Sequence, residues 1–194
     1  MLFRSGSEGP PIENVVRTTY NPLVRRLREI EKPIVAAVNG VAAGAGANIA
    51  LACDLVIAAE HASFVQAFSK IGLVPDSGGT FVLPRLVGLA RATAMTFLGD
   101  KVSAAEAHAL GMIYRVVAGA ALMDEARALA RRLAAMPTRG LGLTKRALNQ
   151  SLANDLATQL EVEAELQAEA ATTEDYREGV GAFLGKRPPV FQGR

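Results

Sequence analysis

The chain has a single cysteine, no tryptophan and only two histidines among its 194 residues. One cysteine cannot form a disulfide within the chain, and thiolate zinc sites need several. Cys53 follows Ala52 in an apolar run, where a small buried hydrophobic side chain is the simplest interpretation. His61 and His108 have no ligand partners at metal spacing. The sequence therefore predicts neither a metal site nor a disulfide framework.

Long hydrophobic runs and an excess of one charge are also missing. No stretch approaches the ~20 uninterrupted apolar residues of a membrane helix. The start, MLFRSGSEGPPIENVV, lacks the apolar core of a signal peptide. Lys+Arg 21 against Asp+Glu 19 give a formal net charge of +2, too balanced to indicate a nucleic-acid surface. We therefore expect a cytoplasmic protein with no nucleic-acid or membrane partner.

The residues that are present predict an α/β protein. Half of the chain is hydrophobic, enough for one compact domain with a sizeable core. Continuous apolar runs predict buried strands, and they alternate with helical patterns, which favours largely parallel pairing. The expected extended segments are 34–38, 54–59, 63–68 and 112–117. No internal repeat is evident.

Helical patterns fill most of the remaining chain. An amphipathic helix is expected over 12–30, with Pro22 interrupting or kinking it. Ser103 and Glu106 form a capping box that begins a further helix. From residue 90 onward the chain reads as almost wholly helical apart from 112–117. The other expected helices cover 46–53, 80–87, 120–135, 138–152, 154–173 and 174–184.

A Gly/Ala-rich turn, GVAAGAGAN at residues 40–48, follows one strand and opens a helix. Such a turn presents unpaired backbone N–H groups near the positive end of a helix dipole, which can bind an anion or stabilise an oxyanion. The turn matches neither the dinucleotide-binding nor the P-loop pattern. A tight turn that packs helix against strand explains it equally well.

Asp76 is a lone carboxylate in the loop VPDSGG. Between Lys32 and Gly99 the only other acids are Asp54 and Glu60. Asp54, at a strand start, is expected to accept hydrogen bonds from backbone N–H groups. Asp76 either caps the helix that follows, which the residues alone slightly favour, or lies in an apolar pocket and moves a proton.

Four segments resemble the crotonase (enoyl-CoA hydratase/isomerase) superfamily: KPIVAAVNGVAAGAGANIALACDLVIAAEHASF, FSKIGLVPDSGGTFVLPRLVG, SAAEAHALGMIYRVV and DYREGVGAFLGKRPPVF. The resemblance implies a crotonase-like spiral of ββα turns followed by a helical C-terminal trimerisation region. On this basis we expect a loose N-terminus over 1–11, a partial spiral core over 12–120 and a helical region over 121–194. It also implies a coenzyme A thioester substrate, no separate cofactor, and a homotrimer or hexamer.

The resemblance also implies roles for individual residues. The backbone N–H of Ala45 corresponds to one of two donors that bind the thioester oxygen. Asp76 corresponds to the acid of isomerase-type members, which shifts the interpretation from cap to catalyst. Asn48 and Phe68 stand where hydratases carry two glutamates, which disfavours hydration.

Further positions are expected to contact the substrate. Gly44 and Gly46 would let the backbone approach the thioester, and Asn48 lies beside them. Phe68 and Val74 would line the acyl pocket. Lys186 would meet a phosphate of coenzyme A, in its own subunit or across an interface; a frayed C-terminal tail is the alternative for the Lys186-Arg187 pair.

Family members begin with additional strands and a loop of the type Ala-Gly-x-Asp-Leu that supplies the second oxyanion donor. Nothing in residues 1–13 resembles that loop, so we expect an N-terminally truncated copy whose activity alone is weak or absent.

Within the superfamily, YNPLVRRL, FSKIGLVPDSGGT and LPRLVGLARA most resemble the 1,2-epoxyphenylacetyl-CoA isomerases of phenylacetate degradation. This predicts conversion of 2-(1,2-epoxy-1,2-dihydrophenyl)acetyl-CoA to oxepin-CoA, and also Δ3–Δ2 enoyl-CoA isomerisation. The alternatives are an enoyl-CoA hydratase, another acyl-CoA reaction of the same family, and an inactive module that only binds a CoA thioester.

Overall fold

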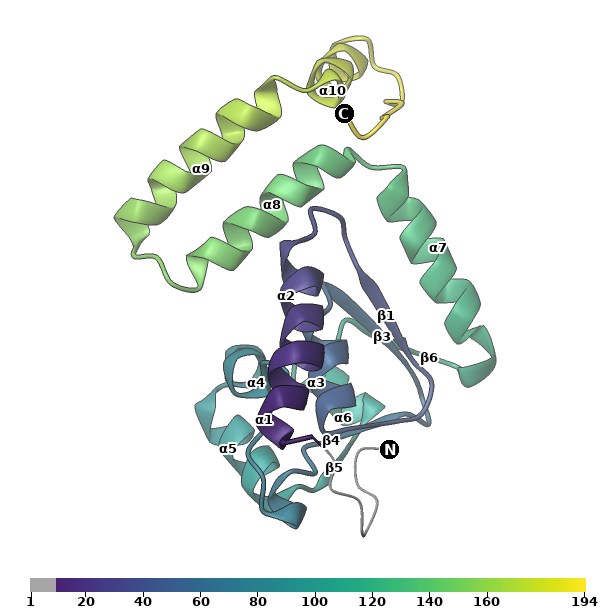
Figure 1. The fold of residues 1–194 in the computed structure, drawn as a ribbon. Coiled ribbons are helices and arrows are strands. Elements are labelled where there is room, and N and C mark those ends of the chain that lie inside the picture. The colour runs from purple at the N-terminus through teal and green to yellow at the C-terminus, as the bar shows by residue number, and fades with distance from the viewer. Residues whose placement is uncertain (1–9) are drawn as a thin grey trace.

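The computed structural model describes residues 10–194 as two small sheets surrounded by helices (Figure 1). Most of the N-terminal segment 1–11, expected to be loose, lies outside the described residues. The strands are β1 (Val35–Val38), β2 (Val41–Ala43), β3 (Leu55–Ala59), β4 (Ser63–Val65), β5 (Lys101–Ser103) and β6 (Arg115–Val117). The α-helices are α1 (Ile12–Val15), α2 (Asn21–Glu29), α3 (Ala45–Ala52), α4 (Gly79–Val87), α5 (Leu89–Leu98), α6 (Ala104–Ala109), α7 (Leu122–Ala134), α8 (Thr138–Ser151), α9 (Leu156–Ala171) and α10 (Glu174–Leu184). A π-helical segment, η1 (Val16–Tyr20), and two 3₁₀ turns, η2 (Ser69–Ile71) and η3 (Gly119–Ala121), complete the elements.

The chain builds two consecutive ββα units. β1, β2 and α3 form the first unit, and β3, β4 and α4 form the second. The first strands pair in parallel in the sheet β1-β3-β6, and the second strands pair in parallel in the sheet β2-β4-β5. This is the predicted α/β spiral. The two ββα units form a structural repeat. This repeat is not evident in the sequence, because the units share a backbone topology and not a pattern of residues.

The core lies between the sheet β1-β3-β6 and the helices around it. β3 is the middle strand and is almost entirely buried, as its apolar run predicts. α7 packs along β1 and β3, while α3 and α4 pack against each other on the other side (Figure 1). The largest apolar side chains that are fully enclosed are Ile57, Phe64, Leu83 and Leu122.

The structure corrects several sequence-based expectations. β2 and β5 have only three residues each, too few for a periodic signal, and β5 interrupts a region expected to be helical. β4 pairs with β5 in antiparallel orientation, so pairing is not parallel throughout. The third extended segment ends at Val65 and not at residue 68.

Pro22 does not break the first helix. It lies in the first turn of α2, directly after η1, where the N–H of Asn21 bonds to the carbonyl of Val16. Pro22 has no N–H for the carbonyl of Thr18, and a π turn lets the helix continue with a shifted hydrogen-bond register. The predicted helix start at Ser103 is confirmed, because Ser103 Oγ accepts the N–H of Glu106 at 3.2 Å; this is one of the two hydrogen bonds of a capping box.

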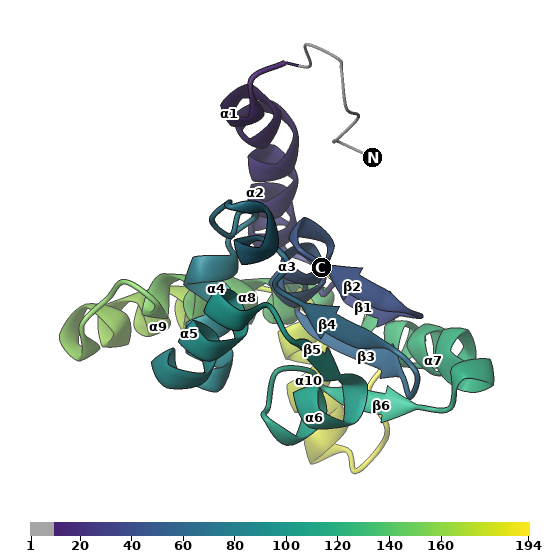
Figure 2. The same ribbon diagram turned by 90° about the horizontal axis from the view of Figure 1, so that it is seen from below.

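The helices α8, α9 and α10, in lighter green and yellow, form an arm at one end of the molecule (Figure 1). Seen from below, α9 extends to one side of the sheets (Figure 2). α8 packs against α2 on one side and α9 on the other. Within residues 10–194 no helix is both long and apolar enough to span a bilayer.

Candidate active site

The Gly/Ala turn places a free backbone donor at the start of α3. Gly44 has φ +54°, a conformation that favours glycine, and its N–H bonds to the carbonyl of Val65 at 2.8 Å. Ala45 is the first residue of α3, and no side chain caps this helix. Among the residues that the structure describes, none accepts the N–H of Ala45. This donor, at the positive end of the helix, can bind an oxyanion.

Phe68 closes over the same turn. Its ring is buried, and a Cβ placed on Gly44 would lie 3.5 Å from the ring edge. The ring of one predicted site residue therefore lies over the backbone of another that is 24 positions away in the sequence. The packing interpretation of the turn is therefore supported, while binding of an oxyanion by the turn stays a prediction.

Asp76 does not cap the helix that follows it. α4 begins at Gly79, its cap is Gly78, and no side chain bonds to its first turn. The Asp76 carboxylate instead accepts the hydroxyl of Ser77 at 2.9 Å. Ser77 is buried and has φ +52°, so the loop turns sharply directly after Asp76. The cap interpretation is wrong, because the Asp76 carboxylate bonds to Ser77 and does not cap α4.

Asn48 is 1 % exposed and bonds to this loop from α3. Its Nδ2 donates to the carbonyl of Asp76 at 2.9 Å, and its Oδ1 accepts Gln66 Nε2 at 2.8 Å. These contacts bring the Asp76 loop against the first turns of α3. Gln66 is a functional candidate that sequence reasoning missed, because an isolated glutamine carries no pattern.

Asp76 lines an open cleft of about 430 Å³. One wall comes from the loop before Asp76, including Val74, whose side chain is 80 % exposed. The other wall comes from α1, η1 and the start of α2, which the sequence did not single out. The lining residues are Ile12, Glu13, Val16, Arg17, Asn21, Leu73, Val74, Pro75 and Asp76. Glu13, the second carboxylate, is paired with Arg17 at 2.8 Å.

Lys186 lies apart from these residues within one chain. It follows α10, which Figure 1 shows at the opposite end of the molecule from α4. The tail around it is attached, because Arg187 forms a two-point ion pair with Glu178 at 2.6 and 2.7 Å. This guanidinium and the N–H of Val190 lower the pKa of Glu178 to about 2. The C-terminal tail is therefore not frayed at this point. Binding of a phosphate by Lys186 stays a prediction.

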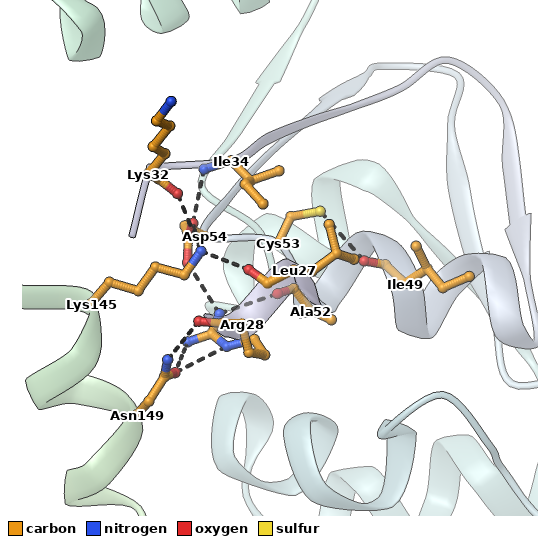
Figure 3. A network of polar contacts seen from close by, with 10 residues as sticks. All are labelled: Leu27, Arg28, Lys32, Ile34, Ile49, Ala52, Cys53, Asp54, Lys145 and Asn149. Atoms are coloured by element: carbon orange, nitrogen blue, oxygen red, sulfur yellow. Dashed lines mark hydrogen bonds and ion pairs between the residues drawn. The ribbon is translucent and has the colours of Figure 1, made fainter. Parts of the chain in front are cut away.

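Asp54 has the structural role that the sequence predicts. Its Oδ2 accepts the N–H of Ile34 at 2.8 Å, and it also pairs with Lys145 at 2.8 Å and Arg28 at 3.2 Å (Figure 3).

Burial raises the pKa of the neighbouring Cys53 thiol, which keeps it protonated and a poor nucleophile. The buried Lys145 was not foreseen, since its partners lie far away in sequence.

No group of three or more His, Cys, Asp or Glu side chains in residues 10–194 is placed to hold a metal ion. In the described residues, the cleft, the backbone N–H of Ala45 and the Asp76 side chain are the features on which a chemical role can be proposed.

Comparison with known proteins connects these features to a family. The family model described as enoyl-CoA hydratase/isomerase matches residues 4–194. The 1,2-epoxyphenylacetyl-CoA isomerase of Escherichia coli (strain K12) is 55% identical over 185 residues, which cover 95% of this chain and 71% of that protein. A Rhodobacter capsulatus protein named "Probable enoyl-CoA hydratase" is 48% identical over 193 residues, covering 100% of this chain and 75% of that protein. The crystal structure of an enoyl-CoA hydratase from Bacillus anthracis superposes with a TM-score of 0.91 at 32% identity, covering 98% of this chain and 74% of that one.

Proposed function

Because this chain belongs to the enoyl-CoA hydratase/isomerase family, we propose that it is an isomerase of acyl-CoA thioesters that uses Asp76 as its proton carrier. The Asp76 carboxylate takes a proton from the carbon next to the thioester carbonyl and returns it to another carbon of the acyl group. No atom is gained or lost, so the reaction needs no cofactor beyond the coenzyme A of the substrate. We further propose 2-(1,2-epoxy-1,2-dihydrophenyl)acetyl-CoA as substrate and oxepin-CoA as product: the bond between the two carbons that carry the epoxide oxygen breaks, the ring expands, and the proton returns to a ring carbon. Δ3–Δ2 enoyl-CoA isomerisation is proposed as a second activity.

The observation that carries this proposal is the set of acids along the cleft. Asp76 is hydrogen-bonded to a neutral hydroxyl, whereas Glu13 is tied to Arg17. Asn48 and Phe68 bring no acid to the site. One carboxylate can remove a proton from the substrate and return it at another carbon, which is all that isomerisation requires. This arrangement suits isomerisation better than the addition of water, for which hydratases of this family use two glutamates.

The Ala45 N–H would stabilise the enolate formed after proton removal. It is the first donor of α3 and has no acceptor in the described part of the chain. An oxyanion donor of this kind is worth ~10²–10³ in rate. Gly44 and Gly46 flank it with no side chain to obstruct the thioester.

The lining of the cleft is suited to binding an apolar acyl group. Ile12, Val16, Leu73 and Val74 present apolar surface, and its volume falls in the range of small-molecule sites, roughly 300–1,000 Å³. Phe68 would add an aromatic wall above Gly44 and keep water from the enolate. Asn48 would lie behind this surface.

We also propose that copies of this chain form a homotrimer or hexamer through the C-terminal helices. Large apolar side chains are exposed there: Leu148, Leu152, Leu156, Leu160, Val180, Phe183 and Leu184. In such an assembly Lys186 of one copy would reach a coenzyme A phosphate bound by another copy. Contact across an interface is favoured because Lys186 and Asp76 lie apart within one chain.

Asp76→Asn tests the proposed chemistry. The amide cannot accept the proton, so kcat should fall by about 10²- to 10⁴-fold while the protein stays folded. The measurement is turnover of the epoxide thioester and of a Δ3-enoyl-CoA. Glu13→Gln, at the other carboxylate of the cleft, is the control and should keep at least half of the parental rate.

The outcomes separate the alternatives. Isomerisation by Asp76→Asn at the parental rate would show that another group moves the proton. Hydration of an enoyl-CoA by the parental protein would support the hydratase alternative, which the Rhodobacter capsulatus relative favours. Binding of acyl-CoA without turnover, measured by calorimetry, would indicate a binding module.

A further inference from the structure

Asn48 and Gln66 form a relay of two buried amides that ends on the backbone of Asp76. Both side chains are almost fully buried. Gln66 Nε2 donates to Asn48 Oδ1 at 2.8 Å, and Asn48 Nδ2 donates to the Asp76 carbonyl at 2.9 Å. The relay joins the end of β4, the first half of α3 and the loop that precedes α4.

The direction of the relay follows from the groups at its end. A backbone carbonyl can only accept, so Asn48 must turn its NH₂ group toward Asp76. The Asn48 oxygen then faces Gln66, and Gln66 must turn its own NH₂ group toward it. Each amide orientation is therefore dictated by the Asp76 carbonyl.

The same carbonyl is held from a second side. The N–H of Gly79 donates to it at 2.9 Å. A Cβ on Gly79 would lie 2.2 Å from Asn48 Nδ2, so the Asn48 amide lies directly against the α-carbon of Gly79. Two donors thus fix the backbone at Asp76, while Ser77 holds its carboxylate at 2.9 Å.

Gln66 is not explained by packing alone. Its Oε1 is buried and has no hydrogen-bond partner in the part of the chain that the structure describes. An unpaired buried oxygen is unfavourable, and an apolar side chain of similar length would avoid that cost. Within the described residues, the Gln66 side chain makes one hydrogen bond, the bond that orients Asn48.

We propose that Asn48 and Gln66 are positioning residues, which hold Asp76 at the place where its carboxylate meets the acyl group. The inference rests on the proposed function of Asp76 as proton carrier. It gives Asn48 a role other than the substrate contact expected from the sequence, since both ends of its amide already have protein partners. It also means that a carboxylate at position 48 would oppose the Asp76 carbonyl rather than support it.

Kinetics of Asn48→Ala and Gln66→Met test this role. A misplaced carboxylate lowers the rate of proton transfer but not substrate binding. We expect kcat to fall by about 10- to 100-fold in Asn48→Ala and in the same direction in Gln66→Met, with KM changed by no more than about twofold. Because the two act in one relay, the double variant should be no slower than Asn48→Ala.

Stability supplies a second readout. Gln66→Met also removes the unpaired oxygen, so its melting temperature should not fall even though its kcat does. A purely structural role would change both together. If Asn48→Ala does not fold, Gln66→Met carries the test. Asn149→Ala is the matched control: it removes an asparagine bonded to Arg28 in the structural network and should lower the melting temperature without lowering kcat.

Amide hydrogen exchange of Gly79 in the substrate-free protein separates this inference from the proposed function. Exchange should accelerate in Asn48→Ala and Gln66→Met whether or not the parental protein turns over an isomerase substrate. An absent parental activity would overturn the proposed function alone. A raised KM with unchanged kcat would make Asn48 a substrate contact, and unchanged kcat with unchanged exchange would show that the relay positions nothing.

Discussion

At the scale of the residue, the candidate site contains positions with an unusual backbone angle or with little room for a side chain. Gly44 and Ser77 both have positive φ angles, and each lies next to a residue with a proposed chemical role. Gly79 has an ordinary φ but no room for a side chain. The positive φ at Ser77 is uncommon for a residue with a Cβ, and local strain of this kind is often found at functional sites.

Gly79→Ala tests this close packing. The new methyl group would meet Asn48 Nδ2 at 2.2 Å and push the amide from the Asp76 carbonyl. We expect a loss of about 1–3 kcal/mol in the free energy of unfolding, measured by chemical denaturation. Gly181→Ala is the control, because nothing lies within 4 Å of its Cβ position in α10. It should stabilise the protein by up to about 1 kcal/mol. Equal stability of Gly79→Ala and the parent would contradict the packing argument.

At the scale of the element, charged side chains join the helical arm to the spiral core. Lys145 of α8 is 7 % exposed and donates to Asp54 and to the carbonyls of Leu27 and Lys32 (Figure 3). A second cluster joins Glu31 to Arg139 and Arg146 of α8. The Arg146 guanidinium, above all, lowers the pKa of Glu31, so this carboxylate is ionised at neutral pH. These contacts hold α8 against the end of α2.

The substitution Asp54→Ala should lower the free energy of unfolding. It leaves the buried Lys145 ammonium without an anion and beside Arg28, and loss of one partner of such a pair costs about 3–5 kcal/mol. Thermal or denaturant unfolding measures the change. Asp124→Ala removes an exposed carboxylate 3.9 Å from Arg127 and should change stability by less than about 0.5 kcal/mol. If the two variants lost the same amount, the buried network would not be what joins these elements.

At the scale of the whole molecule, the C-terminal arm exposes more apolar surface than an isolated chain needs. Phe183 is 84 % exposed, and Leu156 and Leu184 are 75% and 74% exposed. Scattered exposed apolar residues are ordinary, but a series of them on adjacent helices indicates a surface that another molecule covers. The self-association through α8–α10 that we propose would account for this series.

Phe183→Asp should shift the protein toward the monomer. A charge in the centre of an apolar interface is costly to bury, so the assembly should dissociate, as measured by sedimentation velocity. Phe97→Asp is the matched control, because Phe97 is 75% exposed on α5, outside the arm. Dissociation by Phe97→Asp but not by Phe183→Asp would place the interface elsewhere.

Local signals predicted the regular elements well. α10 spans the expected residues 174–184, and the buried strands β1 and β3 lie within the expected segments. The helix at Ser103 begins where its capping box indicated. These features depend on neighbours a few residues away, which the sequence shows directly.

Other features depend on partners distant in the chain. β2 and β5 are strands only because β4 lies beside both. Asp76 could equally have been a cap until the structure showed Gly78 in that position. The cleft could not be foreseen, since one of its walls comes from α1 and η1, about sixty residues before Asp76.

The sequence alone determined the family, the alternation of apolar strands with helices, and the lone carboxylate after a Gly/Ala turn, because each is carried by residues that are adjacent in the chain. Only the tertiary structure decided how that carboxylate is held. It brings Asn48, 28 residues before Asp76, within hydrogen-bond distance of the Asp76 carbonyl, and Gln66, 10 residues before Asp76, within hydrogen-bond distance of Asn48. Such amide contacts need exact orientation and burial, which no spacing in the sequence specifies.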